Sequence, residues 1–536
     1  MSEGKYSPGA SGAPLEKEMI QREMCPEIPG LEAGCDYTLP DYLPEIRRVL
    51  SVRAEVLPAA HYESEGGVEA SGAVLHTLLY ADGEGRLSAL PLHADYAFKV
   101  EGDGVAVHAA VVDSCAGGTV CRLGGPRKVS LRTRLASRAC LFADESVSPE
   151  IRGMGSDGDQ DSIERLTEEL ESARVLTARS PEIALSASLP LDGTGESTRV
   201  VWSGGGVLVN ECRAERDAVL ARGEVWVRLL CADGDGTPYA LRERIPFESR
   251  VELVGVREGD GCVAHGRVLS SDVSIAMGEG EEKGYATADL CIELELTAVG
   301  RERCTPTSAL YSTAYDMDCQ YRELSYHRPL GVAMGHYTVS GSRARAECDA
   351  VEAHTVIDAH GRVEVGAVTE EGGRTIVSGR VLCDLITAEP PVGEGLLPVL
   401  GTATVECPFR IACDLHLPSD ASPTFVCHAS LVGAKGRLEE HALAVDCELA
   451  LWVRAHEKRS MRILATAEPK GALAPTEAGC VHVVYPQKGD SLFSLAARYH
   501  KKRAALAKAN GLSDAALQKA ATAASLDGVH HLLIEE

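Results

Sequence analysis

Aromatic residues are scarce in this sequence: Phe, Trp and Tyr together supply 4% of 536 residues, although the hydrophobic share as a whole is 45%. That hydrophobic share, with 25% charged residues, is ordinary for a folded protein, so we expect cores built from aliphatic side chains. The length exceeds what one core supports and predicts roughly three or four domains.

Long apolar runs and an excess of positive charge are also missing. No stretch approaches 18 uninterrupted apolar residues, and the N-terminal segment lacks the apolar core of an export signal. We therefore expect a cytoplasmic protein without a transmembrane segment. The net charge of -26 opposes binding to phosphate backbones and to anionic lipid, so we expect no nucleic-acid partner.

The 18 cysteines lack the paired spacing of a zinc site, because no Cys-x-x-Cys sequence occurs. Several lie singly inside alternating or apolar runs, where a thiol behaves as a small core residue. These are Cys231, Cys291, Cys383, Cys407, Cys413 and Cys447. The sequence therefore predicts reduced, mostly buried thiols, no metal site and no cofactor.

Motifs of catalysis are likewise absent. We find no Gly-x-Ser-x-Gly elbow, no phosphate-binding P-loop and no His-Glu-x-x-His helix. Cys427 and His428 are adjacent, but they lie in a β-patterned run that favours a core thiol beside an outward histidine. A carboxylate pair among the 79 acidic residues stays open as an alternative. We expect the protein not to be an enzyme.

What the sequence does contain is a repeat. The run Gly67–Leu92 has counterparts in Arg216–Leu253 and Gly373–Leu415. Aligning Gly72 with Gly223 places Asp82-Gly83-Glu84-Gly85 over Asp233-Gly234-Asp235-Gly236 without a gap, and Gly379 takes the same position in a third copy with a longer turn.

Each copy is patterned as β structure. Alternating strands flank an Asp-Gly turn, and a long alternating segment follows, which is typical of a sandwich or barrel. The long segments are Arg127–Phe142, Tyr285–Gly300 and His441–Ala455. The anchor glycines recur about every 150 residues, which is the length of a domain. We therefore predict three tandem antiparallel β-sandwich-like domains.

Two other segments stand out. In Met154–Leu176 a Gly/Asp-rich stretch leads into a helical pattern with Ile163, Leu166, Leu170 and Val175 on one side, which predicts a linker with a short helix. In Leu39–Ala60, Pro40 and Pro44 stiffen the backbone that leads into the first sheet. Ile46, Val49 and Leu50 are expected to pack on that sheet. The alternative for this entry segment is an exposed docking motif.

The C-terminus changes character. It predicts a strand at Val481–Tyr485, a helix capped by Asp490 or Ser491 and running through Tyr499, a second helix at about Arg503–Ala509, and a closing strand within Gly528–Glu536. This is a small βααβ module.

The sequences GDSLFSLAARY, LAKANGL and DGVHHLLI in this module resemble a LysM domain, a fold known for binding N-acetylglucosamine polymers such as peptidoglycan and chitin. The alanine-rich segment between Leu512 and Asp527 is longer than is usual in that family. The resemblance implies a binding face on the two loop regions. The position of Phe493 on its helix predicts that it leans outward beside Tyr485, and the alternative is that it only shields the module's own edge. The predicted residues of the binding face are Tyr485, Gly489, Asp490, Ser491, Phe493, Asn510, Gly511 and Leu512.

The entry sequence LPDYLPEIRRVLSVRAEVLP, with CRLGGPRKVSLRTR further on, resembles the SPOCS domain of spore-forming Firmicutes, also called DUF3794. Three such units before a LysM domain are the arrangement of the SipL family. The resemblance implies a non-enzymatic adaptor in spore-coat assembly, in the mother-cell cytoplasm at the forespore surface, that binds the coat morphogenetic ATPase SpoIVA and other coat proteins. The alternative is a peptidoglycan- or cortex-binding protein whose LysM domain holds glycan.

These observations give a mainly β chain with the following predicted parts. They are an N-terminal extension at 1–35, SPOCS-like domains at 36–150, 178–325 and 326–468, linkers at 151–177 and 469–480, and a LysM domain at 481–536.

Overall fold

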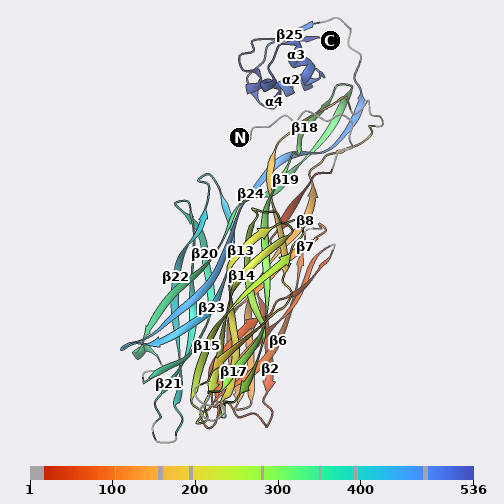
Figure 1. Ribbon diagram of the computed structural model, residues 1–536. Coiled ribbons are helices and arrows are strands. Elements are labelled where there is room, and N and C mark those ends of the chain that lie inside the picture. The colour runs from red at the N-terminus through yellow and green to blue at the C-terminus, as the bar shows by residue number, and fades with distance from the viewer. Residues whose placement is uncertain are drawn as a thin grey trace.

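A computed structural model of the chain confirms the mainly β prediction (Figure 1). It describes residues 17–64, 66–102, 104–154, 161–191, 197–278, 283–348, 352–391, 393, 396–474 and 481–535. Parts of both predicted linkers, at 155–160 and 475–480, lie outside the described residues. Within the described ranges no helix is long and apolar enough to cross a membrane.

Three units of the same design follow one another, and each consists of two antiparallel sheets, each built on one central strand. In the first unit β3, β4 and β6 pair with the central β5, and β1, β2 and β7 pair with the central β8. The second unit contains the sheet β13-β14-β15 and a sheet in which β11, β12 and β16 pair with the central β17. The third pairs β20-β21-β22 and β19-β24-β23.

The bounds in the first unit are β1 Met19–Met24, β2 Leu31–Thr38, β3 Arg48–Val56, β4 Ala60–Ser64, β5 Gly67–Ala81, β6 Leu87–Glu101, β7 Ala109–Gly125 and β8 Lys128–Ser146, followed by β9 Glu150–Ile151 and β10 Ile163–Thr167. In the second they are β11 Leu170–Arg179, β12 Ile183–Pro190, β13 Arg199–Glu215, β14 Ala218–Ala232, β15 Pro238–Glu252, β16 Gly261–Ala276 and β17 Tyr285–Cys304, followed by β18 Thr307–Ser312. In the third they are β19 Tyr315–Ala344, η1 Arg345–Glu347, β20 Thr355–Glu371, β21 Arg374–Glu389, β22 Val399–His416, β23 Pro423–Leu438 and β24 Ala442–Ala472.

The three anchor glycines occupy equivalent positions, which confirms the repeat. Gly72 on β5 lies opposite Tyr96, Gly223 on β14 opposite Phe247, and Gly379 on β21 opposite Phe409. In each case a methyl group on the glycine would lie 2.6–2.8 Å from the aromatic ring or its hydroxyl. Glycine is therefore required because the neighbouring ring lies across the backbone.

The Asp-Gly turns are also equivalent in the first two units. The Asp82 carboxylate accepts backbone N–H groups of Glu84 and Arg86, each at 2.9 Å, and Asp233 does the same for Asp235 at 3.0 Å and Thr237 at 2.8 Å. Gly85 and Gly236 then adopt nearly the same positive φ, 86° and 85°. The turn chemistry read in the sequence thus sets both hairpins.

We predict that Gly223→Ala destabilises the second unit by about 1–3 kcal/mol, the range for overpacking. The added carbon would lie 2.0 Å from the Leu208 carbonyl oxygen and 2.8 Å from the Phe247 ring. The matched control is Gly83→Ala, because nothing lies within 4 Å of its added carbon. Urea unfolding of the two variants checks this, and equal losses would contradict the account of the glycine.

Two predictions about the segments before and between the units are wrong. Segment 1–35, expected as an extension, contributes β1 and the start of β2 to the first unit, where both pair with β8. The short helix expected within Met154–Leu176 is absent from the described residues of that segment, where β10 and β11 lie instead. β11 pairs with Glu295–Cys304 of β17, and this pairing overrides the helical spacing of its apolar residues.

The entry segment packs on the first unit, as its structural interpretation expected. Leu39 and Ile46 are buried against Leu78 and Tyr80 of β5, and the Tyr80 hydroxyl donates to the Pro44 carbonyl at 3.2 Å. Val49 packs against the same cluster, and Leu50 is buried. Tyr42 stays 83% exposed.

The units do not form an extended string but pack side by side around shared buried charges. Asp358 of the third unit pairs with Arg53 of the first unit and with Arg228 of the second, the latter at 3.3 Å. Asp113 of the first unit pairs with Arg267 of the second and accepts from His428 of the third at 2.9 Å. An apolar cluster with members from all three units, including Leu50, Leu230 and Ile386, lies at the same junction.

We predict that Asp358→Ala lowers the free energy of unfolding by about 3–5 kcal/mol, because it leaves two buried guanidinium groups without their counterion. The control is Glu69→Ala, whose exposed pair with Lys99 contributes at most about 1 kcal/mol. Chemical denaturation at neutral pH measures both, and similar small losses would contradict the role of the junction.

The junction also predicts acid sensitivity. Burial by itself would raise the pKa of Asp358, but the charges of Arg228 and Arg53 outweigh burial and lower that pKa to about 2. Since this pKa is lower in the folded than in the unfolded chain, the stabilisation is complete above about pH 4 and is lost as the pH falls toward 2. Denaturation midpoints between pH 2 and 5 should fall more steeply for the wild type than for Asp358→Asn.

Of the 17 described cysteines, all but Cys25 and Cys115 are buried or half-buried, in agreement with their expected use as core residues. Cys231, Cys383, Cys407, Cys413 and Cys447 are fully inside, whereas Cys291 is half-buried. The reduced state remains a prediction, and thiol titration of the unfolded chain without reductant tests it.

Candidate binding site on the C-terminal module

The C-terminal module lies at one end of the molecule, beyond the long β19–β24 ribbon (Figure 1). It consists of β25 Val481–Val484, α2 Leu492–Arg498, α3 Arg503–Ala509, α4 Asp514–Gln518, η2 Ala523–Leu526 and β26 Leu532–Glu535. The predicted βααβ order is confirmed. The alanine-rich insertion adds α4 and η2, which the sequence analysis did not predict.

The start of α2 is held by its own sequence. Ser491 caps the helix and exchanges bonds with Ser494: the Ser491 hydroxyl accepts from the Ser494 N–H at 3.1 Å, and the Ser494 hydroxyl accepts from the Ser491 N–H at 2.8 Å. Gly489 supplies a φ of 97° in the preceding turn, and Asp490 accepts from the Gln487 N–H at 2.9 Å and from Arg498 at 3.0 Å. These three predicted site residues therefore build the turn.

The insertion closes on this turn. The Leu492 N–H donates to the Ser525 hydroxyl at 2.9 Å, and the Phe493 N–H donates to the Ala520 carbonyl at 3.0 Å. With the Ser494 N–H bound to the cap, the first three amide donors of α2 are all satisfied inside the module. The two loop regions that were expected to form a binding face are therefore bonded to each other at this point.

The other predicted residues lie at the end of α3. The Asn510 side chain donates to the Leu533 carbonyl at 2.8 Å and accepts from the Leu533 N–H at 2.6 Å, so it joins α3 to β26. Gly511 takes the left-handed conformation that ends the helix, with a φ of 64°, and Leu512 is half-buried at the rim of the core. This group has a structural role in the module.

Phe493 does not lean outward, and that prediction is wrong. Phe493 is 8% exposed, and its ring packs edge-on against the Tyr311 ring with 5.2 Å between the two ring centroids. Tyr311 belongs to β18, which pairs with β10 to form a two-stranded ribbon outside the module. The helical position of Phe493 lies beside the core of the module and would be exposed in the module alone. In the whole chain the β10–β18 ribbon covers it.

Three polar contacts support the same docking. Arg503 pairs with Glu164 of β10 at 2.7 Å, and the Tyr311 hydroxyl donates to the Lys501 carbonyl at 2.8 Å. His500 adopts a φ of 51° and donates from Nδ1 to the Ser312 carbonyl at 2.9 Å. The module is thus held by ring packing, an ion pair and backbone contacts. The sequence analysis missed this interface, because nothing near Glu164 or Tyr311 in the sequence marks them as partners of a distant helix.

One face of the module is apolar and uncovered. Val481 and Val483 of β25 and Tyr485, directly after this strand, are 55%, 52% and 71% exposed. Leu533, opposite Val483, is 39% exposed. We call these four residues the outer face. The alternate residues Val484, Leu532 and Ile534 belong to the core of the module. Only Tyr485 of the outer face was among the predicted site residues.

We predict that Tyr311→Ala loosens the module from the ribbon without unfolding the three units. The change removes the ring contact with Phe493 and the bond to the Lys501 carbonyl. Amide hydrogen exchange should become faster in Thr307–Ser312 and Leu492–Arg498. The control Tyr62→Ala, at a position 73% exposed, should leave both segments unchanged. Unaltered exchange in the Tyr311 variant would contradict the docking.

Elsewhere in the part of the chain that the structure describes, two clusters each bring three potential metal ligands within 4.8 Å of one another: Glu23, Cys25 and Cys140, and Asp113, Cys115 and His428. In each cluster the carboxylate is already paired with an arginine, Arg454 or Arg267. A metal ion would compete with these guanidinium groups, so neither cluster favours a metal. Neither cluster can be found from the sequence, because Cys140 and His428 come from strands far along the chain from the other members.

Comparison with known proteins identifies the module. A family model described as LysM domain matches residues 487–518. No curated protein and no solved structure matches the chain. The LysM domain indicates binding of peptidoglycan or a related glycan. The matched residues span the turn, α2, α3 and the part of the insertion that forms α4.

Proposed function

We propose that this protein is a non-enzymatic adaptor in endospore coat assembly, in which the three β units form one platform and the LysM domain contacts the coat ATPase SpoIVA. The resemblance of the repeats to SPOCS domains and of the whole arrangement to the SipL family is the basis for the choice of partner. The protein would act in the mother-cell cytoplasm at the forespore surface.

The observation that carries this proposal is the outer face of the LysM domain. Its four residues are apolar, and such a patch is the kind of surface on which hot spots of protein interfaces form. The helix side of the domain is held by β10 and β18, and the α2 amides are bonded internally. These features favour a protein ligand on the outer face over a sugar chain between the loops.

Glycan binding is the second candidate, and the LysM match itself favours it. Tyr485 would then stack on a sugar ring, since it is 71% exposed beside His531. In that case the partner is a peptidoglycan or cortex glycan and the β units serve as a spacer.

Binding of the full chain to purified SpoIVA and to peptidoglycan sacculi separates the two. We expect Val483→Asp to weaken SpoIVA binding by about tenfold or more, because it places a charge in the centre of the outer face. The matched control is Val254→Asp, at a position 82% exposed in the second unit. Binding to sacculi that Tyr485→Ala abolishes, with no affinity for SpoIVA, would replace the adaptor by the glycan-binding protein.

A further inference from the structure

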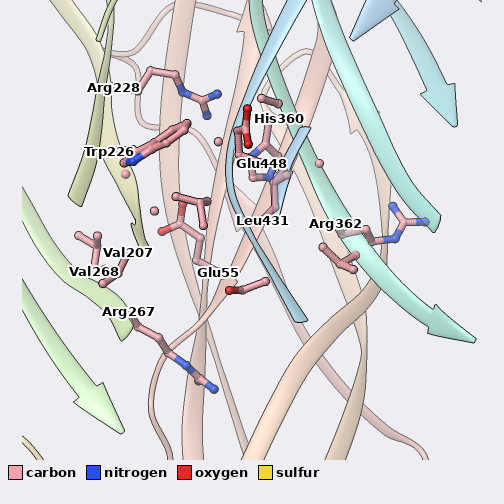
Figure 2. Close-up of a pocket in the computed structure, with 18 of the residues that line it drawn as sticks. Glu55, Val207, Trp226, Arg228, Arg267, Val268, His360, Arg362, Leu431 and Glu448 are labelled. Carbon is pink, nitrogen blue, oxygen red and sulfur yellow. The ribbon is translucent and has the colours of Figure 1, made fainter. Parts of the chain in front are cut away.

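A cavity of about 700 Å³ lies where the three units meet (Figure 2). Six strands supply much of its wall: β3 and β7 of the first unit, β13 and β16 of the second, and β20 and β23 of the third. These six are edge strands of their sheets, and β14, β15 and β24 add further lining residues. The volume falls within the range of small-molecule sites.

Equivalent positions of the repeat line this cavity with different chemistry. Glu55 lies opposite Leu75, Gly206 opposite Trp226, and Arg362 opposite Leu382, each three residues beyond the anchor glycine of its unit. One position of the repeat thus carries a carboxylate, no side chain and a guanidinium in the three units. The cavity therefore has an asymmetric charge pattern within a repeated fold.

The carboxylate of Glu55 lies in the middle of the cavity group, between Val207 and Val268 on one side and Leu431 and Arg362 on the other (Figure 2). Within the described residues it makes no hydrogen bond and no ion pair. Burial raises its pKa, an effect that the charges of Arg53 and Arg228 only partly offset. These two arginines instead bind Asp358. The Glu55 carboxylate is half-buried and has no protein partner in the ranges described, so it can accept hydrogen bonds from a ligand in the cavity.

Two cationic side chains without a protein partner in the described part of the chain also line the cavity, one from the second unit and one from the third. Among the described residues Arg242 and Lys435, which both line the cavity, form no hydrogen bond or ion pair, and both are exposed. Six basic and four acidic side chains line the cavity, although the whole chain has 53 basic and 79 acidic residues. An anionic group is therefore favoured beside the arginines and an ammonium group beside Glu55.

We propose that this cavity binds a short peptide as a zwitterion, with its free ammonium group on Glu55 and its free carboxylate toward Arg242 and Lys435. Val207, Val268 and Leu431 provide apolar wall for small side chains between the two charges. This site is separate from the outer face of the LysM domain and does not depend on the proposed adaptor role.

Titration calorimetry of the full chain with trialanine tests the proposal. We expect saturable binding of trialanine, and at least tenfold weaker binding of its N-acetylated and its C-amidated forms, because each lacks one of the two charges. Glu55→Gln should weaken trialanine binding at least tenfold, and Arg242→Gln with Lys435→Gln should remove the preference for the free carboxylate. The control Glu440→Gln, at a site 90% exposed, should bind as the wild type does.

Glu55→Gln is expected to fold, since it removes a charge that burial disfavours, and its thermal midpoint should equal or exceed that of the wild type. No binding of trialanine at millimolar concentration would overturn the proposal. Equal binding of the acetylated peptide, or of the Glu55→Gln variant, would do so as well. Should the Glu55 variant fail to fold, the Arg242 and Lys435 variant decides the matter by its carboxylate preference alone.

Discussion

The carboxylate of Asp358 is the constraint on which the arrangement of the units depends. It is 1% exposed and is shared by Arg53 and Arg228, so one residue from each unit meets at this point. Removing the Asp358 carboxylate would leave the two guanidinium groups without their counterion, which costs more than the complete pair contributes. Asp113, Arg267 and His428 repeat the arrangement at a second point, and together the two junctions fix how three similar units pack.

This packing also deals with the unpaired edges of the sheets. Edge strands expose free backbone groups and invite aggregation unless something covers them. Here β3, β13 and β20, with β7, β16 and β23, turn their edges toward the centre of the molecule and toward one another. The same packing leaves a cavity with a charged wall. The charges on this wall are arranged asymmetrically, because the side chains at equivalent positions differ among the units. A repeated fold has thereby produced a centre that is not symmetric.

Local features of the sequence predicted local structure well. The anchor glycines, the Asp-Gly turns, the long alternating strands and the Ser491 cap depend on neighbours in the chain or on one hairpin partner. The predictions failed where a partner far away in the sequence determines the structure of a segment or the exposure of a side chain. The apolar residues of β11 are spaced as in a helix, but pairing with β17 makes this segment a strand. Phe493 is covered by Tyr311, 182 residues earlier in the chain. The vacant charges of Glu55 and Arg242 are equally invisible in sequence, because they become a site only after three units have packed.

The LysM domain is held by the β10–β18 ribbon and presents one apolar face to solvent. Photo-crosslinking in a sporulating host tests this most directly, with benzoylphenylalanine in place of Tyr485 in one variant and of Tyr42, exposed in the entry segment, in another. We expect a crosslink to SpoIVA from position 485 and none from position 42. A crosslink from position 42 alone would contradict this expectation and would make the entry segment the docking motif.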